Sequence, residues 1–254
     1  MLSSFFESES VTKALEILKT EIPLAVWETF YVTVLSTLFA IIIGLPLGVL
    51  LVAGENGKIL KIPKSLLHIL NVIINLLRSV PFLILMIMVF PLTRLIMGTV
   101  VGTAASFVPL VIAAFPFVAR LVEGSLREIN PNIIETAQSM GASPFQIIVK
   151  VMLPESVPSL ISNATIAITT ILGYSAMSGI IGGGGLGKIA INYGYYRYQY
   201  LVMAFAVIFL VLLVQLFQSL GTFLAAKADK RLKENKKENK ADGGNKSLRL
   251  TSNI

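Results

Sequence analysis

The chain has 254 residues, of which 55% are hydrophobic and 14% charged, and its mean hydropathy is +0.79. Soluble domains carry about 25% charged residues, so this balance predicts an integral membrane protein. The absence of cysteine excludes disulfides, thiolate metal sites and cysteine nucleophiles, and one histidine, His68, leaves little material for a metal site or an acid–base pair. The composition therefore argues against an enzyme and predicts no metal and no cofactor in this chain.

The net charge of +7 belongs mainly to the C-terminal end, because nine of the 21 basic residues lie at or after Lys227. A basic tail beside a membrane suits anionic lipid of the inner leaflet as a partner. A solvated, disordered end is the alternative, since Lys, Glu, Asn and Gly dominate residues 227–254. Both interpretations describe a basic cytoplasmic tail, and neither requires nucleic acid.

Residues 1–22 are acidic and rich in serine, which is not typical of a cleaved signal peptide. The apolar run that follows them is also longer than the roughly 7–15 residues of an h-region. Residues 11–22 suit a short amphipathic helix lying on the membrane. We expect residues 1–22 to form an N-terminal extracytoplasmic extension and residues 23–226 to form one transmembrane domain.

Five segments have the roughly 20 apolar residues that a membrane-spanning helix needs. They are residues 30–53, 66–97, 99–119, 157–181 and 201–225. The second span could begin as late as Val80, and this decides the position of Arg78. If Arg78 lies within the span, burying its charge costs free energy and the residue becomes a functional candidate. If it lies at the edge of the span, its side chain extends to the membrane interface. The sequence thus predicts an all-α membrane protein with five transmembrane helices.

The distribution of Lys and Arg predicts which loops face the cytoplasm. With the N-terminus outside, the short inside loops carry six basic residues and the short outside loops carry three, and the basic tail also falls inside. The six are Lys58, Lys61, Lys64, Arg120, Arg127 and Lys150, and the three are Arg94, Lys188 and Arg197. We therefore predict that the N-terminus lies outside and the C-terminus in the cytoplasm.

The segment from about Arg120 to Glu155 is typical of two short helices joined at a sharp corner. Asn130-Pro131 is an N-cap followed by proline at the first helical position, and Ser143-Pro144 repeats this arrangement. Gly141 suits the residue just past the first helix, and Pro154 should stop the second. The first helix carries an apolar stripe beside charge, which indicates a cytoplasmic docking element for another protein. The stripe is Ile133, Ile134, Ala137 and Met140.

The glycine-rich residues 182–188 match the first seven positions of a P-loop, but Ile189 stands where the magnesium-binding Ser or Thr belongs. No soluble βαβ unit surrounds the segment, so we expect a flexible connection at the outer mouth of the bundle and no nucleotide site. The aromatic residues 193–200 suit an interfacial belt, with a contact surface for an external partner as the alternative.

The fourth span carries a row of hydroxyl side chains, which suits either a helix lining a hydrated route or hydrogen bonds between helices. Met177 lies among small residues and suits a soft hydrophobic plug, although methionine also fills gaps in a core. The candidates for the pathway or its gate are Thr169, Tyr174, Ser175, Met177 and Ser178.

The corner segment also resembles the E-A-A-x3-G-x9-I-x-L-P motif of ABC importer permeases. The matching residues are Glu135-Thr136-Ala137, then Gly141, then Val151-Met152-Leu153-Pro154, with mild departures at Thr136 and Val151. Four further segments are similar to the permeases of methionine-uptake importers, namely residues 78–82, 91–94, 141–144 and 173–177. The resemblance covers residues 22–227.

This resemblance implies a type I importer permease fold in a multi-pass protein of the bacterial cytoplasmic membrane. It implies a homodimer above two ABC ATPase subunits, which bind the ATP and Mg, and an extracytoplasmic binding protein or lipoprotein that delivers methionine. The coupling helices would be residues 131–152, with Glu135, Thr136, Ala137, Gly141, Leu153 and Pro154 as ATPase-coupling residues. The alternatives are the same machinery importing another amino acid or small solute, an intramembrane enzyme, and a scaffold without transport.

Overall fold

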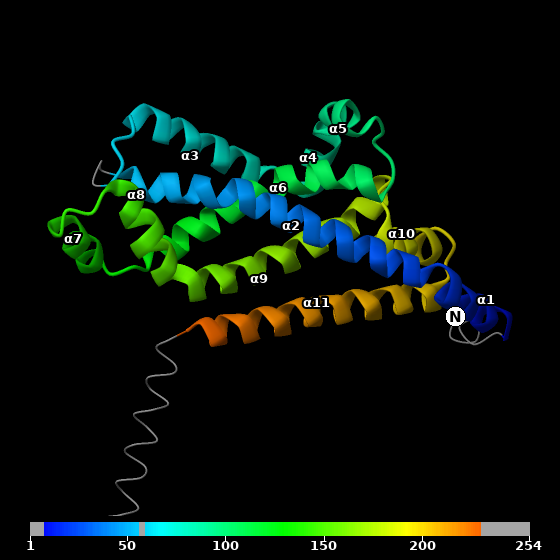
Figure 1. The fold of residues 1–254 in the computed structure, drawn as a ribbon. Coiled ribbons are helices and arrows are strands. Elements are labelled where there is room, and N and C mark those ends of the chain that lie inside the picture. The colour runs from blue at the N-terminus through cyan, green and yellow to red at the C-terminus, as the bar shows by residue number, and fades with distance from the viewer. Residues whose placement is uncertain (1–7, 56–58, 230–254) are drawn as a thin grey trace, which may run out of the picture.

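A computed structural model describes residues 8–55 and 59–229, and every element within these ranges is helical (Figure 1). The all-α fold is thus confirmed, while most of the predicted basic tail lies outside the described residues. The helices are α1 (Ser8–Thr20), α2 (Ile22–Ala53), α3 (Lys64–Ser79), α4 (Phe82–Met88), α5 (Phe90–Met97), α6 (Thr103–Arg127), α7 (Pro131–Ser139), α8 (Pro144–Gln146), α9 (Leu153–Ser178), α10 (Gly185–Ile189) and α11 (Tyr200–Ala228). Three tighter or wider helical segments complete the list: η3 (Ile147–Met152), η4 (Gly179–Ile181) and η5 (Ala190–Tyr195).

Within the described residues, four helices are long and apolar enough to cross a membrane: α2, α6, α11 and a continuous rod from Pro144 to Ile181. The second predicted span, residues 66–97, is not one helix, because α3 and α4 meet at 109° and α5 follows them. Proline disfavours helical backbone in the residue before it, and Val80, which precedes Pro81, has φ −79° and ψ 127°. The five predicted spans are therefore four single helices and one broken one.

Two helices continue through residues that were expected to end them. The predicted third span ended at residue 119, but α6 continues to Arg127, since Glu123 forms ion pairs with Arg120 and Arg127 inside the helix. Pro154 does not stop the second corner helix, which continues to Ile181. The π-helical segment η3 lies directly before α9, and its wider turn accommodates the proline at the start of α9.

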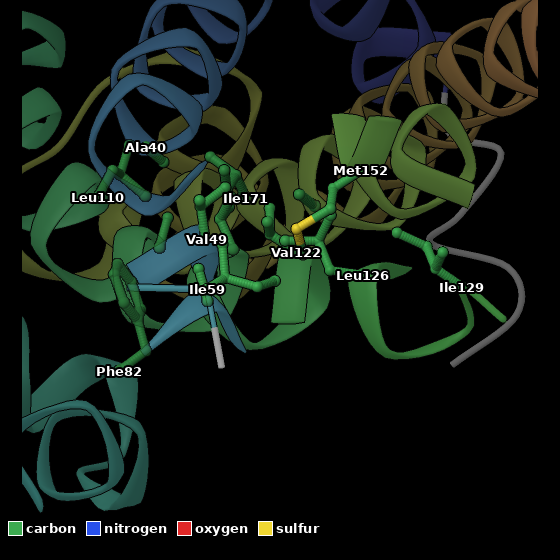
Figure 2. Packing of buried hydrophobic residues seen from close by; sticks show 14 of the residues in the cluster. Ala40, Val49, Ile59, Phe82, Leu110, Val122, Leu126, Ile129, Met152 and Ile171 are labelled. Atoms are coloured by element: carbon green, nitrogen blue, oxygen red, sulfur yellow. The ribbon is translucent and has the colours of Figure 1, made fainter. Parts of the chain in front are cut away.

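The main hydrophobic cluster lies between α2, α6 and α9, and Figure 2 shows it from close by. Gly44 and Gly48 of α2 let α2 and α6 approach each other closely. A Cβ at either glycine would lie 2.8 Å or less from the Val118 or Val122 side chain of α6. Close helix packing through small residues is therefore used within this single chain.

A second cluster joins α1 to the N-terminal part of α2 and to α10 and α11. Ala14 of α1 is buried there with Ile22 of α2 and Val202 of α11. The predicted N-terminal helix therefore forms, and it packs on the same bundle as the spans. Figure 1 shows α1 and α10 at one end of this bundle, the α10 end, and α7 at the opposite end, the α7 end.

Candidate coupling corner and pathway face

The first helix of the corner, α7, has both ends fixed by local hydrogen bonds, as its sequence predicts. The Asn130 side chain accepts a hydrogen bond from the Asn132 amide at 3.0 Å. At the other end, the Gly141 amide donates to the Gln138 carbonyl at 2.9 Å, and the Ala142 amide donates to the Ala137 carbonyl at 3.1 Å. Together with the left-handed φ of +78° at Gly141, these two bonds make a Schellman motif.

The second helix of the corner starts with a capping box. The Ser143 hydroxyl accepts from the Gln146 amide at 3.4 Å, and the Gln146 side chain accepts from the Ser143 amide at 2.9 Å. Because the rod from Pro144 to Ile181 begins here, the corner is joined to α9 without an intervening loop. A displacement of the corner would therefore move α9 directly.

The corner presents large apolar side chains at the surface. Met140 is 82% exposed and Phe145 is 73% exposed, whereas Ile134 and Ala137 pack against the main cluster. The predicted apolar stripe is thus divided between the bundle and the surface. Exposed apolar residues on a polar corner are typical of a protein-binding site.

The six predicted coupling residues lie along this corner and its junction with α9. Glu135, Thr136 and Gly141 are exposed around the first helix, with Ala137 turned toward the bundle. The other two follow η3 at the start of α9, where Leu153 packs against the main cluster and Pro154 is exposed.

Most hydroxyl groups of the predicted pathway helix bond to carbonyls of their own helix, and Ser175 also accepts a hydrogen bond from the Thr33 hydroxyl of α2 at 3.5 Å, as the interhelical alternative predicts. Ser175 donates to the Leu172 carbonyl at 2.8 Å, Ser178 to the Ser175 carbonyl at 2.7 Å, and Thr169 to the Thr165 carbonyl at 3.1 Å. Ser175 and Ser178 are also buried within the chain. Tyr174 stacks on Phe82 of α4 at 4.6 Å between ring centroids and so ties the broken span to α9.

The open side of α9 is formed by different residues. Ser162, Ile166, Gly173 and Met177 are exposed, and their spacing of four, seven and four places them on one side of the helix. We call these four residues the α9 face. A cavity of about 650 Å³ adjoins it toward the α7 end, between α6, α9 and α11, and is lined by hydroxyl groups such as those of Ser125, Ser159, Thr165 and Thr222. Met177, at 47% exposure, is the predicted gate residue that lies on this open face.

The glycine-rich segment at the α10 end is closely packed, so the expectation of a flexible connection is wrong. The Gly185 amide donates to the Glu28 carboxylate at 2.7 Å, and the Leu186 amide donates to the Thr29 hydroxyl at 2.9 Å. A Cβ on Gly187 would lie 2.1 Å from the Ala176 carbonyl oxygen. These glycines allow α10 to lie against α2 and α9 with backbone in contact.

The predicted aromatic cluster is largely exposed at the α10 end. Tyr195, Tyr196 and Tyr198 lie at the surface, while the Tyr193 hydroxyl donates to the Glu21 carboxylate and holds η5 to the start of α2. This hydrogen bond, together with partial burial, raises the pKa of the Tyr193 hydroxyl above its ordinary value. Arg197 lies over the Tyr193 ring at 4.7 Å from its centroid.

A network of charged and polar side chains between α3, α6 and the segment after α2 was not predicted from the sequence. Glu123 is 8% exposed and contacts Arg120 at 2.5 Å and Arg127 at 2.9 Å. Arg127 also contacts Glu55 at 2.7 Å, and Arg120 donates to the side-chain oxygens of Asn71 and Asn75 at 2.8 Å each. Arg120, Glu123 and Arg127 are separated by three and four residues, a spacing that brings charges together on a helix and could have predicted the α6 part of this network.

Comparisons with known proteins agree on one family. Residues 40–234 match the binding-protein-dependent transport system inner membrane component family. The probable D-methionine transport system permease protein MetI of Vibrio cholerae is 46% identical over 208 residues, which cover 82% of this chain and 92% of that protein. The protein of the same name from Pasteurella multocida is 49% identical over 208 residues, covering 82% and 95%.

A solved structure supports the same assignment. A chain of the MetNI methionine ABC transporter, seen in inward-facing conformations, superimposes with a TM-score of 0.80 and 44% identity, over 82% of this chain and 96% of that one. It covers the same share of this chain as the two sequence relatives do. The chain therefore belongs to the binding-protein-dependent transport system inner membrane component family.

Proposed function

We propose that this chain is the membrane subunit of an ATP-driven importer that moves methionine across the cytoplasmic membrane. The corner carries the transport part of this proposal, because it is a capped, surface-exposed docking element continuous with a spanning helix. The substrate part is supported by relatives that are named as D-methionine permeases at 46% and 49% identity.

In the proposed assembly, two copies of the chain form the pathway and two ATPase subunits bind the corners. The ATPase subunits hold the ATP and Mg, and an extracytoplasmic binding protein delivers methionine. Met140 and Phe145 provide apolar contacts to the ATPase, and Glu135 provides a charge beside them. The orientation with the α7 end in the cytoplasm is part of this proposal.

Motion reaches the pathway through the rod from Pro144 to Ile181. When ATP closes the two ATPase subunits, the corners move together, and the rod carries this displacement to Met177, 33 positions after Pro144. The rod has no loop in which the displacement could be absorbed, so the α9 faces of the two copies change their separation. This is alternating access produced by rigid-body movement of helices.

Reconstitution of the complete complex tests the proposal. The chain, its ATPase and its binding protein would be placed in proteoliposomes, and uptake of labelled methionine would be followed with and without ATP. We expect ATP-dependent accumulation that excess unlabelled methionine abolishes, and none with an ATPase variant that binds but does not hydrolyse ATP.

The same assay separates the alternatives. If another amino acid inhibits the accumulation at a lower concentration than methionine does, that amino acid replaces methionine as the assigned substrate. The proposed transport function would stand. A complex that assembles but accumulates no solute would reject transport and leave a scaffold.

A further inference from the structure

We infer that Arg78 binds the carboxylate of the transported molecule midway through the membrane. This inference rests on the proposed function, because it concerns the substrate of that same pathway. The inference rests on the depth of Arg78, on the absence of a partner for it among the described residues, and on the positions of the described carboxylates.

Arg78 lies near the middle of the spanning bundle. Leu77 and Val80, which flank it, pack in one cluster with Ile112 and Ala113, and these two lie near the middle of α6. One turn earlier, Ile74 packs with Ala119, closer to the end of α6. Figure 1 agrees, since α3 runs beside the half of α2 nearer to the α7 end and stops partway along it.

The side chain of Arg78 is exposed, and no described residue of the chain pairs with its guanidinium group. Within residues 8–55 and 59–229 it forms no ion pair, in contrast to Arg120 and Arg127, which share Glu123. A charge at this depth is expensive in hydrocarbon and is tolerated where it faces a water-filled cavity or an anion. The exposed side of Arg78 therefore faces a hydrated space rather than lipid.

No carboxylate of the described chain lies at the depth of Arg78. The described carboxylate side chains fall into two groups at the ends of the bundle: Glu16, Glu21 and Glu28 toward the α10 end, and Glu55, Glu123, Glu128, Glu135, Glu155 and Asp229 toward the α7 end. A second copy inserted in the same orientation places its own carboxylates at the same two levels. Dimer formation therefore supplies no acidic partner from these residues, and the anion must come from a bound molecule.

A polar stripe on α3 connects Arg78 to the α7 end. His68, Asn71 and Asn75 precede it at intervals that place all four on one side of the helix, and Asn71 and Asn75 bond to Arg120. The opposite side of α3 exposes Leu66, Ile69 and Leu76. One side of α3 thus suits a hydrated route and the other suits lipid.

The local backbone also favours a ligand at this point. The extended residues Val80 and Pro81 interrupt the span immediately after Arg78, and non-helical backbone at membrane depth is tolerated where it lines a cavity. A guanidinium offers two parallel N–H donors that match the two oxygens of a carboxylate. An α-amino acid carries such a group, so Arg78 would select it over the corresponding amide.

Binding to the purified permease–ATPase complex, without the binding protein, tests this inference. Labelled methionine would be displaced either by methionine or by methioninamide, which lacks the carboxylate, and binding to the ATPase alone would be measured in parallel and subtracted. We expect methionine to compete at least about 10-fold better than the amide in the unaltered complex. Arg78→Gln should weaken methionine binding about 10-fold and remove this preference.

Two further variants make the result specific. Arg78→Lys keeps the charge and should retain part of the preference, which ties the loss in Arg78→Gln to the charge at this position, provided that Arg78→Gln purifies as a complex with its ATPase. Arg94→Gln removes an exposed arginine of α5 and should behave as the unaltered complex. Retained affinity and preference in Arg78→Gln, or no carboxylate preference in the unaltered complex, would overturn the inference. Failure of methionine uptake in proteoliposomes would instead reject the proposed function.

Discussion

At the scale of single residues, glycine determines how closely the helices approach at the α10 end. Gly179 and Gly187 bring η4, α10 and α9 into backbone contact, since a Cβ on Gly179 would lie 2.4 Å from the Lys188 amide nitrogen. Backbone atoms cannot rotate away as a flexible side chain can. A methyl group here must therefore displace α10 as a whole.

We predict that Gly187→Ala destabilises the protein, because its Cβ meets the Ala176 carbonyl at 2.1 Å. Overpacking of this kind costs about 1–3 kcal/mol. Thermal unfolding in detergent should show a Tm lower by roughly 2–4 °C for each kcal/mol. Gly124→Ala is the matched control, because nothing lies within 4 Å of its Cβ position, and the helix should gain about 1 kcal/mol. Equal Tm values for the two variants would contradict the packing role.

Residues 182–187 show what composition alone leaves undecided. A run of glycines is compatible both with a flexible loop and with close backbone packing, because both need the same absence of a side chain. Glu28 and Thr29, which hold the segment, lie more than 150 positions away in the chain. No local pattern indicates such a partner, and the flexible interpretation was therefore wrong.

At the scale of elements, the corner is the part of the candidate site that its own sequence defines best. The caps at Asn130 and Ser143 and the left-handed Gly141 depend only on neighbours within a few positions. The continuation of the helices past residues 119 and 154 was missed although the features that accompany it are also local. They are the ion pairs of Glu123 three and four residues away within α6, and the wide turn η3 directly before Pro154.

We predict that Gly141→Pro leaves membrane insertion intact but uncouples uptake from ATP hydrolysis. Proline is restricted to φ near −65° and cannot adopt the φ of +78° observed at Gly141, so α7 would lose its orientation toward α8. In proteoliposomes, methionine accumulated per ATP hydrolysed should fall at least several-fold. Gly141→Asn can adopt the left-handed conformation and should retain most coupling. Normal uptake by the proline variant would count against the corner as the coupling element.

At the scale of the whole molecule, a single chain leaves functional surfaces without a partner. The α9 face and the polar stripe of α3 are both open in one copy, while most other hydroxyl groups of α9 are already bonded. The sequence correctly indicated that a second copy is needed, because five spans are few to enclose a polar route. It could not indicate which side of α9 is open, since this depends on how α6 and α11 pack against it.

We predict that Met177 seals the resting pathway between the two copies. Met177→Ala shortens a flexible apolar side chain on the α9 face and should increase leak of methionine from proteoliposomes in the absence of ATP. Met97→Ala truncates an exposed methionine of α5 and should leave the leak at its original rate. If both variants retain methionine equally well, the seal lies elsewhere.

The widened turn η3 also absorbs one residue between the corner and α9. An α-helix advances by about 100° per residue, and a π turn accommodates one residue more than an α turn. Deleting one residue within η3, so that it becomes an ordinary α turn, would therefore leave the corner pointing in nearly the same direction about the rod axis. The same deletion farther along α9 would swing the corner by more than a quarter of a circle relative to Met177.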